Sequence, residues 1–451
     1  MAAKTQSPED LTDRRIAIAL FVLAFGVYCY FYGGWGANQE VNYALTRAIV
    51  EGRTFAVDRF TVPEGDIAAG TGGHIYSNKP PGLSVISAAP YWLQYELQQR
   101  RRIRFHDYWR TNKQLVTIQV CGIAGALIPA ILFLYGRRTL GATRRSAALV
   151  AIAIAFGTIV LPYSTMLFAH VPGALFFLLA FTLLKDRPLW AGASAGVAGA
   201  CFLLSGIAAL VLVVLAWSYS KRHALLFLAG GVPFAAALAA YQWICFGSPL
   251  TTPLQESHGY TESGLLLGVF GTPRLSRLWA LTFSEYRGLF FCSPVLLFAL
   301  IGIVVMLRRR RAEAIAIVAI ALVFLVGNSS FNGWHGGAAF GPRYLLPIIP
   351  LLGIAMLFVA DRWRPAWLPV CALSITLNLA VTAVDPQPLE DVRRPLTEHV
   401  VPALLRDQLS LAQDSSLQPS ALWIVAGSSA ILLAARLPRQ TKEFDSRGKG
   451  A

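Results

Sequence analysis

A single carboxylate, Glu40, stands directly after the first long apolar stretch of the chain, in the run NQEVNYALTRAIV at 38–50. Ionisable side chains at the ends of membrane-spanning segments are often functional. A carboxylate in this place can accept the proton of an attacking hydroxyl group, as a general base does. The alternative is an interface carboxylate that pairs with a neighbouring arginine. Asp58 and Asp66 follow in the same segment as further candidates for the catalytic base, although both also fit solvated loop acids.

Two basic residues beside glycine and proline are candidates for binding a phosphate group. Lys79 precedes two prolines in SNKPPG, and Arg343 follows a glycine-rich stretch in FNGWHGGAAFGPRYLLPIIP at 331–350. A guanidinium group holds phosphate oxygens in a bidentate manner, and glycine-rich backbone adds amide donors. His335 and Tyr344 join Arg343 as candidates for the donor site. The alternatives are a lysine that extends to the membrane interface and an aromatic belt with an interface arginine.

Two further polar residues stand where apolar stretches begin. His170, in PYSTMLFAHVP at 162–172, is a candidate for binding a sugar or passing on a proton, and equally fits a packed polar histidine. Arg287, in SEYRGLFFCSP at 284–294, is a candidate substrate contact, with a solvated loop residue as the alternative. No run of histidine, cysteine and acidic residues has the spacing of a metal site, so the residues themselves predict no metal ligand.

The composition indicates the elements that must position these residues. Of the 451 residues, 55% are hydrophobic and 14% charged, and the mean hydropathy is +0.53. Soluble globular chains carry roughly a quarter charged residues and are less apolar. The sequence therefore predicts an all-α polytopic membrane protein. A net charge of +15 would suggest a nucleic-acid partner in a soluble protein, but basic inner loops of a membrane protein explain it, so no nucleic acid is expected.

About twelve transmembrane helices are predicted, because apolar stretches long enough to cross a bilayer recur along the chain. The boundary between the fifth and sixth is the hardest to place, since apolar residues run almost without interruption over 191–220. Ser205-Gly206 is the best break there, and small residues such as Gly196 would let neighbouring helices approach closely. The predicted spans are 15–33, 114–136, 146–162, 168–184, 189–204, 206–220, 223–245, 290–307, 313–328, 344–360, 366–384 and 420–437.

The distribution of basic residues predicts the orientation of these helices. Lysine and arginine gather in alternate short links, which marks those links as the inner side of the membrane. The sequence thus predicts a protein of the cell (inner) membrane with a cytoplasmic tail at 1–14, a transmembrane domain at 15–437 and a second cytoplasmic tail at 438–451. The predicted outer loops are 34–113, 246–289, 329–343 and 385–419.

The first outer loop has its own predicted elements. ANQEVNYALTRAIVEGRTF at 37–55 predicts a short helix that Gly52 ends. TFAVDRFTV at 54–62 alternates as a strand does, and GTGG at 70–73 predicts a turn. The two prolines of SNKPPG cannot lie inside a helix but can start one, and the apolar residues after them suit a helix in the interface plane.

This arrangement resembles the GT-C glycosyltransferases, integral membrane enzymes that use polyprenyl-phosphate sugars. The shared features are an acid just after the first span, a Tyr-Ala in the following helix, and a Lys-Pro ahead of an interfacial helix. The pattern is most similar to the protein O-mannosyltransferases and the bacterial aminoarabinose transferase of lipid A, of the family 39 type. In those families an Asp-Glu pair stands where this chain has Gln39-Glu40, with Tyr or Phe at the position of Tyr43. The aspartate, which is usually given the catalytic role, is replaced here.

The resemblance implies a GT-C fold with a long first extracytoplasmic loop and interfacial helices. It implies a hexosyl- or pentosyltransferase that moves a sugar, with inversion, from a lipid-linked polyprenyl-phosphate donor to an envelope lipid, glycan or protein on the outer face. Lys79 would face the lipid phosphate, and Glu40 or another loop acid would be the base. His170 departs from relatives, which carry a second acid near this place. The resemblance adds no firm protein cofactor and leaves a divalent metal ion open.

Two other classes of protein remain open at this point. A lipid or solute transporter, or flippase, would place ionisable groups near the middle of the bilayer, whereas here nearly all lie at the span ends. A non-catalytic GT-C relative is the other alternative, because Gln39 replaces the family's aspartate. As the geometry of an active site, we expect Glu40, Lys79 and Arg343 to converge on one outer cavity.

Overall fold

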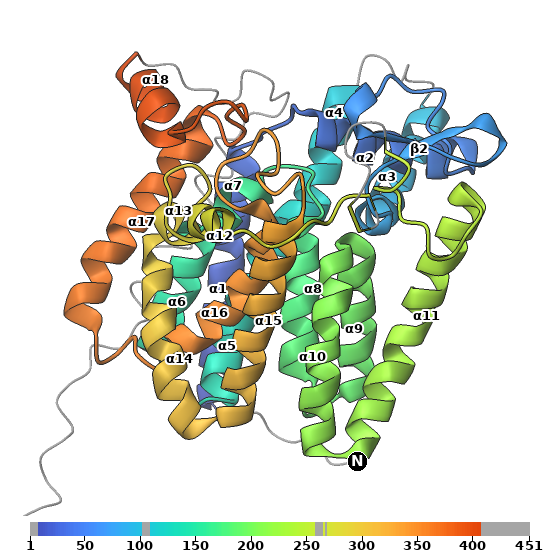
Figure 1. The fold of residues 1–451 in the computed structure, drawn as a ribbon. Helices are drawn as coiled ribbons and strands as arrows, with labels where there is room; N and C mark the ends of the chain where they lie inside the picture. The colour runs from blue at the N-terminus through green and yellow to red at the C-terminus, as the bar shows by residue number, and fades with distance from the viewer. Residues whose placement is uncertain (1–7, 102–108, 258–264, 267, 407–451) are drawn as a thin grey trace, which may run out of the picture.

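The helices run roughly parallel in one bundle, with short helices and loops gathered at its upper end (Figure 1). The computed structural model describes residues 8–101, 109–257, 265–266 and 268–406. We call the upper end the loop end. The opposite end, where the links with Arg137, Arg138 and Arg310 lie, is the arginine end.

The bundle consists of helices of unequal length. Its members are α1 (Pro8–Tyr30), α5 (Ile123–Arg138), α6 (Arg144–Phe156), α8 (His170–Leu183), α9 (Pro188–Cys201), α10 (Leu203–Tyr219), α11 (Lys221–Phe246), α14 (Leu297–Arg309), α15 (Arg311–Ser330), α16 (Ile349–Met356) and α17 (Arg364–Val384). The shorter elements are α2 (Ala37–Arg47), α3 (Gly82–Arg100), α4 (Trp109–Thr117), α7 (Val160–Ser164), α12 (Leu275–Thr282), α13 (Leu289–Cys292), α18 (Val401–Leu405) and the strands β1 (Ile67–Ala69) and β2 (Ile75–Ser77). α4 continues through a π-helical turn, Ile118–Gly122, into α5.

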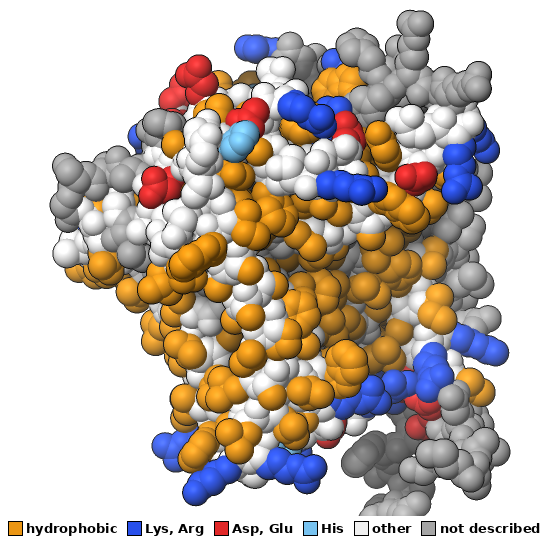
Figure 2. Space-filling view, turned by 90° about the vertical axis from the view of Figure 1, so that its right-hand side faces the viewer, with side chains coloured by type: hydrophobic (Ala, Val, Ile, Leu, Met, Phe, Trp, Pro, Cys, Tyr) orange, Lys and Arg blue, Asp and Glu red, His pale blue; other side chains and the backbone are white. Residues whose placement is uncertain are grey.

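The chain is a multi-pass membrane protein. Four helices are apolar and long enough to cross a membrane, judged by length and composition, and Figure 2 shows an apolar band between two charged ends. These helices are Trp109–Arg138, Lys221–Phe246, Arg311–Ser330 and Arg364–Val384. Helical structure is present in each of the first eleven predicted spans, while the twelfth, 420–437, lies outside the described residues, as does the predicted tail 438–451. The total number of spans therefore stays a prediction.

The break predicted at Ser205-Gly206 is wrong by a few residues. α9 ends at Cys201 and α10 begins at Leu203, with Phe202 between them in an extended conformation at φ −151° and ψ 109°. Hydropathy cannot locate such a break, because the residues on both sides of it are equally apolar. The tertiary structure places it where the ring of Phe202 meets the ring of Tyr344, 5.7 Å away between centroids.

Small residues let α9 and α11 pack closely. A Cβ atom built on Gly192 would lie 1.8 Å from the carbonyl oxygen of Phe227, and one on Gly230 would lie 2.0 Å from that of Leu189. Only glycine fits at these two positions, since real Cβ contacts are never so short. Close backbone approach through small residues is the usual packing of membrane helices.

The first segment at the loop end combines a helix with a small hairpin. α2 and the π-helical turn Ala48–Gly52 cover the range in which the sequence predicts a helix ended by Gly52. The two strands are antiparallel, with Ile67 opposite Ser77, and enclose the glycine-rich turn at 70–73.

The strand predicted at 54–62 is not formed. Val57 N–H donates to the Ile75 carbonyl, but the N–H of Ile75 is taken by the side chain of Asp58, at 2.7 Å, rather than by a backbone carbonyl. A side-chain oxygen that competes in this way is the usual reason for an aspartate to favour a turn over a strand. The alternation of apolar residues in this segment gives no sign of that competition.

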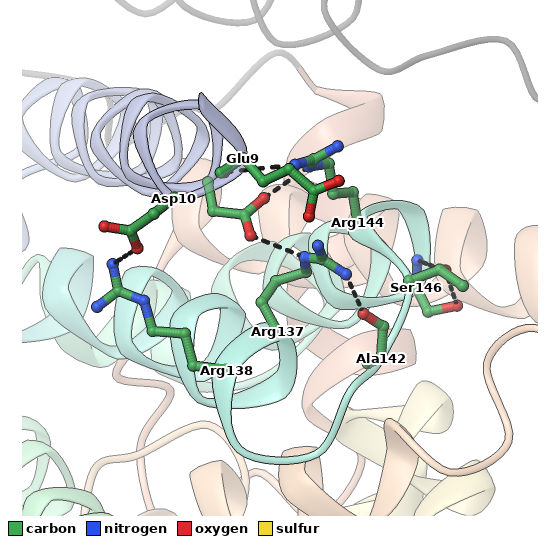
Figure 3. A network of polar contacts seen from close by, with 9 residues as sticks. Glu9, Asp10, Arg137, Arg138, Ala142, Arg144 and Ser146 are labelled. Atoms are coloured by element: carbon green, nitrogen blue, oxygen red, sulfur yellow. Dashed lines mark hydrogen bonds and ion pairs between the residues drawn. The ribbon is translucent and has the colours of Figure 1, made fainter. Parts of the chain in front are cut away.

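The arginine end is held by a network of ion pairs (Figure 3). The buried carboxylate of Asp13, in α1, accepts hydrogen bonds from Arg137 Nε at 3.0 Å and Arg144 Nε at 2.6 Å. Arg137 also donates to the Ala142 carbonyl at 2.6 Å. Three segments far apart in the chain, α1, α5 and α6, are therefore tied together by one carboxylate.

Candidate functional site

A cavity of about 460 Å³ lies at the loop end, lined by α2, the turn before α3, α8, α10 and α15. Part of its lining is apolar and comes from the break between α9 and α10 and the first turns of α10. These residues are Phe202, Leu203, Leu204, Ile207 and Leu210. The polar part of its lining includes Asn38, Asn42, Asn78, Lys79, His170 and Asn328. A largely apolar cavity with a few placed polar groups is the usual form of a small-molecule site.

Lys79 is positioned by the hairpin and by a carboxylate. Its backbone N–H donates to Ser77 Oγ at 3.1 Å, and its ammonium group donates to Asp66 Oδ1 at 2.6 Å. The two side chains of the ion pair are only 13% and 10% exposed. Asp66 itself is fixed by the backbone, because its carbonyl accepts the N–H of Asn78. The pair places an ammonium group in the cavity lining with a carboxylate in direct contact with it.

Arg343 lies beside this cavity, at the start of the 3₁₀ turn that leads into α16. Its guanidinium carbon is 5.0 Å from the ring centroid of Phe168 and 5.2 Å from that of Tyr344. Tyr344 lines the cavity, and its ring lies 5.4 Å from that of His170. Arg343 itself does not line the cavity, but it contacts Tyr344, which does.

His170 forms part of the cavity lining at the first residue of α8 and is buried. Aromatic rings surround it, with centroids at 5.3 Å for Phe202, 5.4 Å for Tyr344 and 5.9 Å for Phe168. Among the described residues, no side chain or backbone group hydrogen-bonds to either ring nitrogen. Buried polar groups are almost always hydrogen-bonded, so this imidazole is exceptional.

Asn328 is a cavity residue that the sequence analysis missed. It lies near the end of α15, is 2% exposed, and neither atom of its amide has a hydrogen-bond partner in the described part of the chain. The signal was present in the sequence, because Asn328 is an amide at the end of an apolar run in GNSS at 327–330. Asn38 and Asn42 also line the cavity and were not singled out.

Glu40 does not line this cavity. Its carboxylate accepts a hydrogen bond of 2.5 Å from the buried ammonium group of Lys113, in α4. Glu40 instead lines a second hollow of about 640 Å³, together with Tyr43, Arg47 and Trp109. The cavity and the hollow are on different sides of α2, since side chains three or four positions apart share one helix face. The expected convergence of Glu40 with Lys79 and Arg343 is thus not found.

Gln39 is buried and makes three hydrogen bonds that define its role in the fold. Its Nε2 donates to the carbonyls of Gly33 and Trp35, and its Oε1 accepts the N–H of Leu167 at 2.8 Å. An aspartate cannot donate to two carbonyl oxygens. The amide thus joins the end of the first span to the segment before α8, in a geometry that an acid in its place would not satisfy.

Three other predicted site residues lie away from the cavity. Asp58 pairs with His74 at 2.9 Å. Burial raises the pKa of the Asp58 carboxyl, but the bonds from Ile75 N–H and His74 outweigh burial and leave the pKa below its usual value. Arg287 is fully buried, and its guanidinium donates to three backbone carbonyls, which belong to Tyr286, His335 and Gly337.

His335, the third of these residues, accepts a hydrogen bond from Gly337 N–H at its Nδ1. Burial lowers the pKa of its imidazole, although the nearby carboxylate of Glu390 opposes that effect. Arg287 and His335 together hold the glycine-rich turn 335–337 in place. Arg343 projects from the same stretch of chain, so this turn positions the cation beside the cavity.

The described residues contain no group of three or more His, Cys, Asp or Glu side chains that could hold a metal ion. All six cysteines are free thiols and buried.

Solved structures of other proteins are similar to this fold. No family model matches the chain, and no curated protein matches it in sequence. The crystal structure of ArnT from Cupriavidus metallidurans bound to undecaprenyl phosphate is similar over 96% of this chain and 71% of that chain, with a TM-score of 0.53 and 13% sequence identity. The structure of the same enzyme in the apo state is similar over 93% of this chain and 75% of that chain, with a TM-score of 0.50 and 16% identity. The chain therefore shares the fold of these ArnT structures.

Proposed function

We propose that this chain, which has the GT-C fold, is a membrane glycosyltransferase that takes its sugar from a polyprenyl-phosphate donor. The observation that carries the proposal is the cavity with an ammonium group in its lining, next to apolar residues that face the membrane. Ile207 and Leu210 line the cavity and are also 55% and 63% exposed on the surface of the bundle. A lipid chain can thus lie along α10 while its phosphate reaches Lys79. The similar ArnT structure is described as bound to such a lipid, undecaprenyl phosphate.

The charge that develops on the leaving phosphate needs cationic groups close to it. Lys79 is the first of these in our proposal, because it lines the cavity. Arg343 is the second, and Tyr344, which contacts Arg343 and lines the cavity, contributes its hydroxyl group to the same end of the site. Arg287 and His335 act one step further out, by fixing the turn that positions Arg343.

The acid that we propose as the base is Asp66, since it touches a cavity residue. The acceptor hydroxyl attacks the anomeric carbon, the bond from that carbon to the phosphate oxygen breaks, and the hydroxyl proton passes to the carboxylate. Asp66 is joined to Lys79 at 2.6 Å, so a phosphate that draws on the ammonium group leaves the carboxylate available for that proton. Glu40 and Asp58 remain candidates from the sequence, but each is paired elsewhere in the structure.

We place the reaction on the extracytoplasmic face of the cell (inner) membrane, with both termini in the cytoplasm. The support is that the short links between helices at the end opposite the cavity carry arginine and lysine, as inner loops of membrane proteins do. The acceptor in this proposal is an envelope lipid, glycan or protein, and the transferred group is a hexosyl or pentosyl unit. The predicted domain limits 1–14, 15–437 and 438–451 are part of the same proposal.

Transfer in reconstituted membranes tests the proposal. The purified protein in proteoliposomes receives radiolabelled polyprenyl-phosphate sugars and an envelope extract as acceptor. We expect label to move to the extract with the wild-type protein and not with Lys79→Ala. Lys221→Ala, at the arginine end, is the matched control for the loss of one lysine. The proposal is wrong if no donor gives transfer with the wild-type protein while the lipid binds.

A non-catalytic lipid-binding protein, such as a flippase, is the second candidate. One observation favours it, namely that no acidic residue lines the cavity within the described part of the chain. A flippase moves fluorescent polyprenyl-phosphate lipid across the bilayer without consuming it. The same proteoliposomes therefore distinguish the two candidates, because a transferase consumes the donor and a flippase does not.

A further inference from the structure

Four buried side chains in the cavity lining have polar atoms without a hydrogen-bond partner in the described part of the chain. His170 has two such atoms, Asn328 has two, and Asn42 and Asn78 each have a carbonyl oxygen. All four residues are at most 5% exposed and all line the same cavity, although they come from four separate segments. Leaving one such group unsatisfied costs on the order of 1–3 kcal/mol. Single atoms of this kind also occur elsewhere among the described residues, for example on Ser87 and Trp367, but here several of them line one cavity that is large enough for a ligand. A ligand in this cavity would supply their partners.

The chemistry of these atoms defines the ligand. The amide of Asn328 offers donors and an acceptor, and an imidazole offers one of each when neutral. Asn42 and Asn78 add carbonyl acceptors only. A mixed set of donors and acceptors without charge matches hydroxyl groups, each of which donates and accepts. A phosphate would need donors alone, and an ammonium group would need acceptors alone.

The charges around the cavity exclude a cationic sugar. Lys79 lines the cavity and the Arg343 guanidinium contacts Tyr344 of the same lining, so both cations repel a second positive charge. The carboxylate in contact with the lining, Asp66, is already paired with Lys79. Desolvating an ammonium group without a carboxylate partner is costly.

The aromatic residues next to His170 complete the site. The rings of Phe202 and Tyr344 are nearly parallel, at 9°, and both line the cavity. The stacked pair gives the cavity an apolar wall against which the C–H groups of a sugar ring can pack, while His170 and Asn328 suit its hydroxyl groups. The break between α9 and α10 places Phe202 in the cavity lining.

We propose that the sugar of the donor is uncharged and carries free hydroxyl groups, and that His170 and Asn328 bind those hydroxyls, with Asn42 and Asn78 as further acceptors. This inference rests on the proposed function and adds the chemical class of the transferred group. Amino sugars such as 4-amino-arabinose are excluded as the preferred substrate.

The test compares the affinities of the full chain, in detergent or nanodiscs, for three lipids: polyprenyl phosphate, polyprenyl-phosphate mannose or glucose, and polyprenyl-phosphate 4-amino-arabinose. We expect the neutral sugar to improve binding over the bare lipid phosphate by about tenfold, the gain from one or two net hydrogen bonds. The amino sugar is expected to bind no better than the bare lipid. Equal binding of amino and neutral sugars would overturn the inference.

Asn328→Leu separates a ligand-binding role from a structural one. Leucine has a similar shape and no polar atoms, so we expect the variant to lose the sugar-dependent gain, to bind the bare lipid as the wild type does, and to unfold at a higher temperature than the wild type without ligand. Asn378→Leu is the matched control, because Asn378 is equally buried but its Nδ2 donates to the carbonyls of Cys292 and Ser374, so only its Oδ1 lacks a partner in the described part of the chain. That control is expected to unfold at a lower temperature.

Two outcomes tell this inference from the proposed function. If the wild type binds none of the three lipids, the proposed function fails. A different result is that the wild type binds the bare lipid and both sugar lipids equally, while Lys79→Ala abolishes binding of all three lipids. In that case the lipid-phosphate site stands and the inference about the sugar is wrong. His170→Gln, which keeps one donor and one acceptor, is expected to retain most of the sugar-dependent gain.

Discussion

At the arginine end of the bundle, the carboxylate of Asp13 is buried and accepts hydrogen bonds from two arginines. In the cavity at the loop end, the imidazole of His170 is equally buried and has no partner among the described residues. Both the arginine end and the cavity contain buried polar side chains. The first satisfies its groups within the chain, which stabilises the fold. The second leaves them unsatisfied among the described residues, which costs stability, and in our proposal a bound ligand offsets that cost. Mutations should therefore have opposite consequences in the two regions.

The largest effect is expected from the cations next to the cavity. Lys79→Ala or Arg343→Ala should reduce sugar transfer by about 100-fold or more, as the loss of one charge-stabilising donor does in other enzymes. Initial rates of label transfer in proteoliposomes measure this. A variant that binds the lipid phosphate and transfers at the wild-type rate would remove that cation from the site.

Asp66→Asn should have the second-largest effect on the rate of sugar transfer. Losing a general base costs about 100-fold or more in rate, while the amide still offers an oxygen to Lys79. We expect transfer to fall and binding of polyprenyl phosphate to persist, as measured by rates and affinities on the same preparation. Full activity of this variant would assign the base to another residue, with Glu40 the first alternative.

At the arginine end the expected effect is on stability alone. Asp13→Asn leaves two partly buried guanidinium groups without their carboxylate and should lower the free energy of unfolding by about 3 kcal/mol. Asp10→Asn is the matched control, because Asp10 pairs with Arg138 and Arg14 near the surface, where these two arginine side chains are 44% and 48% exposed. Its loss should therefore cost about 1 kcal/mol or less. Transfer per folded molecule should be unchanged in both variants.

Gln39→Asp introduces the aspartate that the GT-C families resembling this chain carry at this position. An aspartate would place oxygen atoms against the carbonyls of Gly33 and Trp35, so we expect a loss of about 2 kcal/mol in stability and no gain in transfer. Unfolding curves and transfer rates measure the two effects. A faster enzyme would show that this position still serves catalysis.

The smallest effect on transfer is expected for Glu40→Gln. Glu40 lies on the far side of α2 from the cavity and pairs with Lys113, so transfer should stay close to the wild-type rate while the unfolding temperature drops. The rate of transfer per folded molecule is the measurement that decides. A large loss there would return Glu40 to the mechanism.

The amino-acid sequence predicts most of the helices of the bundle. Runs of apolar residues predict helices wherever the structure describes them, because a bilayer demands long stretches that satisfy their own backbone. The helix ended by Gly52 and the helix that starts after Pro81 also follow from local rules, since glycine and proline act through the backbone of their own neighbours. Lys79 and His170 were found as site candidates because a charged or titratable residue beside an apolar run is conspicuous.

What the sequence could not decide is which way each polar group faces. Gln39 and Glu40 are adjacent, yet successive residues of a helix point in different directions. In the folded chain Gln39 hydrogen-bonds to Leu167, and Glu40 pairs with Lys113 in α4. Asn328, Phe202 and Lys79 line one cavity only because of the tertiary fold, since they come from segments more than a hundred residues apart in the chain. The sequence by itself determined a membrane bundle with basic and aromatic residues at helix ends. The tertiary structure alone decided which of those residues share a cavity, because that depends on long-range packing that no local pattern records.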